Sequence, residues 1–187
     1  MAIRASTETK LLDAADELFF SRGIAATPID AVIERAGVSA ATLYRGYASK
    51  EALLAAALER RQREWLGVWD AAVAAQDTAE ARLLAVFDAL DSFRTRPSGA
   101  RWCAFLGSAA EYPDPPAEVE HAIRSDTDTM RTRLAELAAV VDPRRGDELA
   151  EQLLLLVTGD LAMRLRSPAH STDTARSVAA ALLAQRR

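Results

Sequence analysis

The sequence predicts an all-α protein of about nine helices, with a three-helix head at the N-terminus and a helical bundle after it. Apolar residues recur at intervals of three and four along almost the whole chain, which is the spacing of one face of a helix. Capping and helix-breaking residues separate these stretches, and none shows the strict alternation of apolar and polar residues that is typical of a strand. The periodicity therefore indicates the fold class.

The head contains two short helices joined by a tight turn, between residues 27 and 50. Thr27 is expected as the N-cap of the first helix, with Pro28 at its first helical position. Gly37 ends this helix because glycine adopts a positive φ without steric cost. Ser39 caps the second helix, which runs from residue 40 to about residue 45. Two such helices around a glycine turn make a helix-turn-helix.

The second helix of this pair exposes hydrogen-bonding side chains. Ser39, Thr42, Tyr44 and Arg45 carry hydroxyl or guanidinium groups, which suit phosphates and base edges. We therefore interpret this helix as the recognition element of a DNA-binding protein. An amphipathic helix over residues 7–22 is expected to pack across the pair and complete the head.

The rest of the chain is predicted to be helical. Ser49 caps a long helix that nothing interrupts before residue 76. Further helices are expected over residues 79–93, 101–112, 117–141 and 148–165, and from residue 172 onward. The penultimate helix is apolar nearly all round, which predicts burial on more than one side. We place a domain boundary after residue 50, within the long helix and not in a linker.

Charge and composition limit the class of protein. The 187 residues carry 23 basic and 27 acidic side chains, a formal net charge of −4, so any DNA-binding surface must be a local patch. Residues 1–65 are neutral, with nine basic and nine acidic side chains, and the remainder carries the acidic excess. Cys103 is the single cysteine, which excludes an internal disulfide. No apolar stretch suits a signal peptide or a membrane span, so a cytoplasmic protein is expected.

The order of these elements resembles the TetR family of bacterial transcriptional regulators. The resemblance covers about residues 7–54 and is carried by LLDAADELFFSRG and TPIDAVIERAGVSAATLYRGYASKEALL. The later helices resemble that family only in number, length and order, apart from AAEYPDP before a long helix. The resemblance implies a DNA-binding domain over residues 1–50 and a ligand-binding and dimerisation domain over residues 51–187.

The resemblance also implies roles for residues of the head. Phosphate contacts are expected from Thr27, Tyr44, Tyr47 and Lys50. Ser39, Ala40, Ala41, Thr42 and Arg45 would face the major groove, with Arg45 reading guanine. Arg4 lies on an N-terminal arm that can reach the minor groove. Gly46 replaces a histidine that is frequent in the family, which removes a phosphate contact and loosens the end of the recognition helix.

The bundle holds candidate residues for a partly apolar small-molecule effector and for a dimer interface. Candidate effector contacts are Trp69, Phe87, Phe93, Arg101, Trp102, Phe105, Tyr112, Thr127 and Met130, with Asp126 as a further polar group on an apolar stripe. The aromatic members are equally explained as core residues. The last two helices are expected to form a homodimer through Leu153, Leu156, Leu182 and Leu183.

Several features have a plainer interpretation than a functional one. Tyr47 suits an aromatic core position, and Arg60, Arg61 and Arg63 suit a solvated helix face. His121 and His170 lack partners at metal-ligand spacing, and no catalytic motif or phosphate loop occurs, so we expect no metal, no cofactor and no enzymatic activity. The sequence thus favours a homodimeric repressor that an effector releases from a near-palindromic operator. A DNA-binding dimer without an effector, or a helical binding protein or enzyme with a structural head, are the alternatives.

Overall fold

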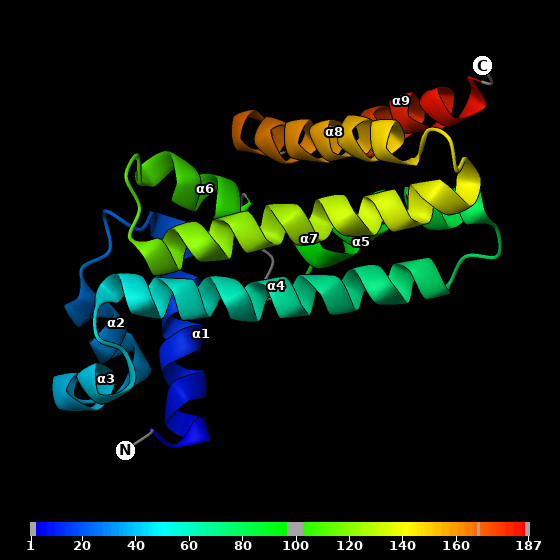
Figure 1. Cartoon of the computed structure of the whole chain (residues 1–187). Coiled ribbons are helices and arrows are strands. Elements are labelled where there is room, and N and C mark those ends of the chain that lie inside the picture. Colours follow the sequence, from blue (N-terminus) through cyan, green and yellow to red (C-terminus); the bar gives the residue numbers. More distant parts are fainter. Residues whose placement is uncertain (1–2, 97–102, 168, 186–187) are drawn as a thin grey trace. The chain divides into compact units, whose positions relative to one another are not determined.

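The computed structural model describes residues 3–96, 103–167 and 169–185. All regular structure in these ranges is α-helical, in nine helices (Figure 1), which confirms the predicted fold class. The helices are α1 (Ala5–Arg22), α2 (Ile29–Ala36), α3 (Ala40–Gly46), α4 (Lys50–Ala74), α5 (Ala79–Arg94), α6 (Ala104–Glu111), α7 (Ala117–Val141), α8 (Gly146–Arg166) and α9 (Asp173–Ala184). None of these described helices is both long and apolar enough to cross a membrane.

By their internal packing, the residues form two units. We call Met1–Gln62 together with Trp102–Arg124 the head unit, and Arg63–Arg101 together with Ser125–Arg187 the bundle unit. The long helices α4 and α7 each contribute residues to both units. The head unit holds α6 as well as α1, α2 and α3. The functional boundary after residue 50 stays a prediction.

The helix α1 provides much of the apolar core of the head unit. Leu11, Leu18 and Phe19 lie on one face of it, and each is at most 3% exposed. Val32 of α2 and Leu43 of α3 are fully buried in the same unit. Burial of one such side chain contributes about 1.5–3 kcal/mol, so a few residues suffice to stabilise two helices as short as α2 and α3.

The caps and the turn around α3 follow the predicted chemistry. Gly37 has φ 64° and ends α2 in the left-handed conformation. The Oγ of Ser39 accepts a hydrogen bond from the N–H of Thr42 at 3.2 Å and caps α3. The Oγ of Ser49 accepts one from the N–H of Ala52 at 3.0 Å, at the start of α4.

The prediction that Thr27 caps α2 is wrong. Pro28 is the N-cap residue, and no side chain caps this helix. The hydroxyl of Thr27 instead lies 2.7 Å from the carbonyl oxygen of Gly23 and 3.2 Å from that of Leu18. The carbonyls at the end of α1 need hydrogen-bond partners as much as the N–H groups of α2 do, and Thr27 serves the former.

The prediction of a solvated face is wrong for Arg61, which is only 4% exposed. Its Nη1 lies 2.9 and 3.0 Å from the two carboxylate oxygens of Asp16 on α1. Its guanidinium also lies over the ring of Phe20, 5.2 Å from the ring centroid. The neighbouring Arg60 pairs with Asp13 at 2.6 Å. These pairs join α4 to α1, which periodicity within either helix does not reveal.

The bundle unit has its own apolar core, in which aromatic residues of α4 and α5 are central. Trp69 and Phe87 are at most 1% exposed. The ring of Trp65 lies 5.7 Å from that of Trp69, and its edge-to-face contact with Phe93 has the same centroid distance, 5.7 Å. Aromatic rings favour such tilted and edge-to-face contacts. Phe93, a candidate effector contact, thus packs against the core.

A buried charge network joins α8 to the segment that follows it. The side chain of Asp160 is fully buried and accepts a hydrogen bond from the Nε of Arg164 at 3.2 Å. Its second oxygen lies 2.8 Å from the Nε2 of His170. A buried carboxylate is tolerated only when such partners compensate for lost hydration. His170 is therefore part of a structural network in the bundle unit.

Candidate nucleic-acid interface

The helix α3 presents one exposed face. Leu43 is fully buried and Tyr47, just after the helix, is 9% exposed, so this side of α3 packs into the head unit. The exposed residues are Ser39, Ala40, Ala41, Tyr44, Arg45 and Gly46, with Thr42 half-buried beside them. Residues 40, 41, 44 and 45 are one helical turn apart and share a face. The predicted major-groove residues are thus brought together on the accessible side.

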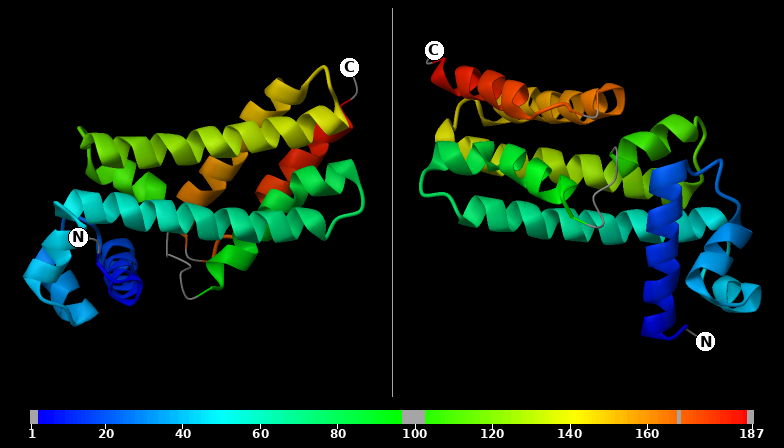
Figure 2. Two further views of the ribbon diagram at one scale, coloured as in Figure 1. Left: turned by 60° about the horizontal axis from the view of Figure 1, so that its bottom comes forward. Right: turned by 180° about the vertical axis from the view of Figure 1, so that it is seen from behind.

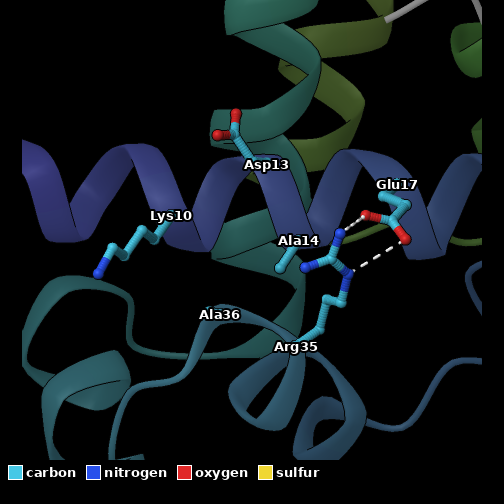
Figure 3. Close-up of a pocket in the computed structure, with 6 residues that line it drawn as sticks. All are labelled: Lys10, Asp13, Ala14, Glu17, Arg35 and Ala36. Atoms are coloured by element: carbon cyan, nitrogen blue, oxygen red, sulfur yellow. Dashed lines mark hydrogen bonds and ion pairs between the residues drawn. The ribbon is translucent and has the colours of Figure 1, made fainter. Parts of the chain in front are cut away.

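The cations of the head unit differ in whether an acid neutralises them. In a shallow depression of about 300 Å³ between α1 and α2 (Figure 3), Arg35 points at Glu17. Its Nε and Nη2 lie 3.1 and 2.6 Å from the two carboxylate oxygens. Arg45, in contrast, has no hydrogen-bond or ion-pair partner within the described ranges. Its guanidinium is therefore available for the N7 and O6 of a guanine.

Side chains of α4 and α6 close the loop between α1 and α2. The carboxylate of Glu111, the last residue of α6, accepts hydrogen bonds from the N–H groups of Ile24 at 3.0 Å and Ala25 at 2.7 Å. The Nζ of Lys50 donates to the carbonyl oxygen of Ile24 at 2.6 Å. Gly23 has φ 97°, and a Cβ there would lie 3.5 Å from Glu111. This closure fixes how the chain passes from α1 to α2.

Two predicted phosphate contacts are consequently engaged within the head unit. Thr27 is 1% exposed, and its hydroxyl lies on the carbonyl oxygen of Gly23. Lys50 holds the carbonyl oxygen of Ile24. Contact of either residue with DNA stays a prediction. Thr27 has a single O–H donor and would have to leave the carbonyl oxygen of Gly23, whereas the ammonium of Lys50 has three N–H donors and can keep the carbonyl oxygen of Ile24 while it donates to a phosphate.

The two tyrosines predicted to contact phosphates differ in accessibility. Tyr44 is 53% exposed. Tyr47 is 9% exposed and donates its hydroxyl to Glu8 at 3.4 Å. Burial, assisted by the charge of Glu8, raises the pKa of Tyr47 to about 12. Tyr47 thus occupies a core position, and the hydroxyl of Tyr44 is the one that solvent reaches.

Besides Phe93, the described candidate effector residues of the bundle unit are Trp69, Phe87, Thr127 and Met130. Trp69, Phe87 and Met130 belong to its apolar core, with at most 8% exposure each. Thr127 is exposed on α7, whereas the adjacent Asp126 is only 8% exposed. The inward-facing polar residue of this pair is therefore Asp126.

The other candidate effector residues precede α7. Phe105 is half-buried on α6, and Tyr112 donates its hydroxyl to Glu51 at 3.4 Å. Arg101 and Trp102 lie outside the described residues. The hydroxyl of Ser108 on α6 is buried without a hydrogen-bond partner among the residues that the structure describes. The role of all these residues in effector binding stays a prediction.

Asp126 is a buried carboxyl group without a hydrogen bond or ion pair in the described part of the chain. Burial raises its pKa to about 7, because the charged form loses hydration that nothing replaces. The indole Nε1 of Trp69 is likewise buried without a hydrogen-bond partner among the described residues. The bundle unit therefore holds two buried polar groups without hydrogen-bond partners among the described residues.

The four leucines predicted at a dimer interface differ in burial. Leu153 is fully buried in the core of the bundle unit, and Leu156, Leu182 and Leu183 are half-buried at its edge. Large apolar residues on the surface of α8 and α9 are Leu155 at 74%, Met163 at 42%, Leu165 at 53% and Val178 at 43% exposure. The sequence pattern predicted a dimer interface on α8 and α9, but it did not distinguish the exposed apolar residues of these helices from the buried ones. The interface stays a prediction.

Glu111 was missed by the sequence analysis. It stands in the AAEYPDP segment, but the two N–H groups that it accepts lie 87 and 86 residues earlier in the chain. The sequence near the loop shows only a glycine at the end of a helix, followed by backbone N–H groups that need an acceptor. It does not show which distant residue supplies that acceptor.

The family model "Bacterial regulatory proteins, tetR family" matches residues 11–57. A relative named HTH-type transcriptional activator FasR, from Mycolicibacterium smegmatis, is 33% identical over 122 residues, which are 65% of this chain and 55% of that protein. The chain thus aligns with about half the length of that relative. The match to the family model includes α2 and α3.

Two solved structures are similar over nearly the whole chain. One is a TetR-family transcriptional regulator from Streptomyces coelicolor, with a TM-score of 0.86, 30% identity, and coverage of 96% of this chain and 95% of that one. The other is a TetR transcriptional regulator from Chloroflexus aurantiacus, with a TM-score of 0.81, 22% identity, and coverage of 96% and 95%. The second match reports on the fold alone.

Replacing Arg45 tests the base-reading side of α3. We expect Arg45→Ala to weaken binding by about 1–3 kcal/mol on the duplex that the wild-type protein enriches from random DNA, and to relax specificity at one base pair. Arg35→Ala is the matched control, since it removes the same charge from a side chain that Glu17 already neutralises. Fluorescence anisotropy titrations measure both. Equal losses for the two variants would remove Arg45 from base readout.

Replacing Asp126 tests its unpaired burial. Its pKa is about 7 in the folded chain, against 3.8 for an aspartate in the unfolded chain, so the folded state binds more protons between these values and is destabilised as the pH rises through them. We expect Asp126→Asn to increase the free energy of unfolding at pH 8 by a few kcal/mol, on the order of 1–3, and to change it little at pH 4. Urea denaturation at both pH values measures this difference. A gain that is the same at both pH values would contradict an unpaired carboxyl group at this position.

Proposed function

Because the chain belongs to the TetR family of bacterial transcriptional regulators, we propose that it acts as a homodimeric repressor that a small-molecule effector releases from its operator. As a member of that family it is a DNA-binding regulator of transcription. Repression, dimerisation and release by an effector are proposed beyond this family membership. The observation that carries the DNA-binding part is the exposed face of α3 with Arg45, which has no partner within the described ranges.

Two copies of α3 are needed for a specific site of useful length. A single short recognition helix reaches only a few base pairs, and a twofold dimer reads two half-sites about 34–36 Å apart or a multiple of that distance. The operator is then nearly palindromic. Because Ala40 and Ala41 offer only methyl groups, readout at their positions would consist of contacts with thymine methyls.

Exposed apolar residues support the dimer. Leu155, Met163 and Leu165 on α8 and Val178 on α9 are each more than 40% exposed in a single chain. α8 and α9 pack against one another within the bundle unit. Large apolar side chains on neighbouring helices favour burial against a second surface, and a second copy of the chain supplies the same surface by twofold symmetry.

Unsatisfied polar groups in the bundle unit support an effector. A ligand with a hydrogen-bond donor or a cationic group would satisfy Asp126, and an acceptor would satisfy the indole of Trp69. Such a ligand changes DNA affinity only if it binds the conformation that fits DNA and the one that does not with different affinities.

The contact of Glu111 with the α1–α2 loop couples α6 to the helix-turn-helix within the head unit. Glu111 ends α6, and its carboxylate holds two backbone N–H groups of the loop that precedes α2. Hydrogen bonds to charged groups contribute about 1.5–3 kcal/mol each. Displacement of the last turn of α6 would therefore change the stability of the loop enough to alter the orientation of α2 and α3.

Activation is a second candidate function. The relative from Mycolicibacterium smegmatis is named a transcriptional activator. A DNA-binding dimer without an effector is a further alternative, since it would use the same helix-turn-helix. The position of the operator relative to the promoter decides between repression and activation, since a bound dimer that overlaps the polymerase site blocks it.

Selection from random double-stranded DNA, followed by a reporter assay, tests the proposal. We expect the protein to enrich a nearly palindromic duplex, and transcription from a promoter that overlaps this duplex to fall when the protein is present. A thermal-shift screen of small molecules then identifies compounds that stabilise the protein and release the duplex. No enriched duplex at low salt would contradict DNA binding, increased transcription would favour activation, and stabilising compounds that never release DNA would contradict the effector.

A further inference from the structure

Asp126 is a buried acid that no basic side chain of α7 neutralises. It is 8% exposed and has no hydrogen-bond or ion-pair partner in the described part of the chain. The arginines nearest to it in the sequence pair with other acids, Arg124 with Glu120 and Arg131 with Asp128. Burial alone raises the pKa of Asp126 to about 7, so no described cation lies close enough to lower it. The carboxyl group thus lies where an added positive charge would stabilise it.

The same face of α7 leads from Asp126 into the aromatic core of the bundle unit. Asp126, Met130 and Arg133 are spaced i, i+4 and i+7, so they share a face. Met130 belongs to the apolar core together with Trp69 of α4. The guanidinium of Arg133 lies 4.8 Å from the centroid of the Trp69 ring and pairs with Asp70. The parts of α4 and α7 in this unit run side by side (Figure 2), so α4 supplies aromatic surface beside Asp126.

This aromatic surface also holds a donor without a partner. The indole Nε1 of Trp69 is buried and donates to no acceptor among the described residues. Trp65, one turn earlier on α4, contacts both Trp69 and Phe93 with centroid distances of 5.7 Å. Asp126 and Arg133 are seven residues apart, about 10 Å along α7, and Arg133 lies over Trp69. One small molecule can therefore reach from the carboxyl group to the indole.

A cationic amine satisfies Asp126 better than a neutral or an acidic ligand does. A neutral hydroxyl donates one hydrogen bond but leaves an ionised carboxylate without a counter-charge. An ammonium group supplies both the hydrogen bond and the charge, and charge-assisted hydrogen bonds are roughly twice as strong as neutral ones. An acidic ligand would place a like charge beside Asp126. Aromatic rings strengthen the preference, because their faces attract cations.

We propose that Asp126 makes the bundle unit selective for an organic cation, an amine on an aromatic body whose far end offers a hydrogen-bond acceptor to the indole of Trp69. This inference rests on the proposed effector and names its chemical class. Asp126 is the residue that contacts the amine, and Trp69 orients the aromatic body.

Matched small molecules that differ only in charge test the proposal on the full chain. Phenyl, naphthyl and biphenyl rings are each used as the ethylamine, the ethanol and the acetate, with and without a terminal methoxy group. Isothermal titration calorimetry measures their affinities. Asp126→Asn removes the charge and keeps the shape of the side chain. Asp128→Asn is the matched control, because Asp128 is an exposed acid of the same helix that pairs with Arg131.

We expect the best amine to bind the wild-type protein at least about tenfold more tightly than the alcohol and the acetate of the same ring. Asp126→Asn should remove this preference, and Asp128→Asn should keep it. Since the amine binds the ionised carboxyl group, its binding should release about one proton when the pH is below 7, and the alcohol should release none. Titrations in buffers of different ionisation enthalpy measure this release. Methoxy amines should bind more tightly than plain ones, and Trp69→Phe should remove that difference.

Equal affinity of the amine, alcohol and acetate in every ring system would overturn the proposal, as would the absence of binding by any amine at millimolar concentration. A preference for amines that survives in Asp126→Asn would overturn the role of Asp126. Equal affinity of methoxy and plain amines would overturn that of Trp69.

Release of the enriched duplex is measured separately and distinguishes this inference from the proposed function. An amine that binds through Asp126 and leaves the duplex bound would contradict the effector function, while the cation site would stand. Neutral or acidic compounds that release the duplex equally from the wild type and from Asp126→Asn would support the effector function and contradict the cation site.

Discussion

The polar groups of one short loop constrain the whole head unit. Between α1 and α2 the chain turns sharply at Gly23, and the loop amides and carbonyls after it have no helix to pair with. Glu111 accepts from Ile24 and Ala25, and Lys50 donates to the carbonyl of Ile24. Hydrogen bonds to charged groups contribute about 1.5–3 kcal/mol each, so these three bonds favour positions of α4 and α6 beside this loop. The orientation of α2, and through Gly37 that of α3, depends on this closure.

In the same unit, acidic residues of α1 form ion pairs with some of the arginines and leave others unpaired within the described residues. Asp13, Asp16 and Glu17 on α1 neutralise Arg60, Arg61 and Arg35. These pairs hold α4 and α2 on α1, and they leave Arg4 and Arg45 without partners within the described residues. An acidic protein can in this way present a local basic surface, because affinity for DNA depends on the field near the phosphates and only weakly on net charge.

Local features were predictable from the sequence and distant contacts were not. The fold class and the caps at Ser39 and Ser49 follow from periodicity and from side chains that bond their own neighbours. Thr27 was placed wrongly because two backbone sites compete for one hydroxyl. Arg61 and Glu111 find partners on other helices, so nothing in their own segments reveals their burial or their bonds. Asp126 was recognised as a polar interruption, but its lack of a partner is a property of the packed structure.

The most direct test of this account is the DNA affinity of Glu111→Gln. Removing an acid from a DNA-binding unit should strengthen binding if charge alone mattered. The account predicts the reverse, a loss on the order of tenfold on the enriched duplex, because two loop N–H groups lose a charged acceptor. Glu118→Gln is the control, since Glu118 is an exposed acid of the same unit without a partner in the described residues. If Glu111→Gln binds as tightly as Glu118→Gln or more tightly, the loop closure does not set the geometry of the recognition helix.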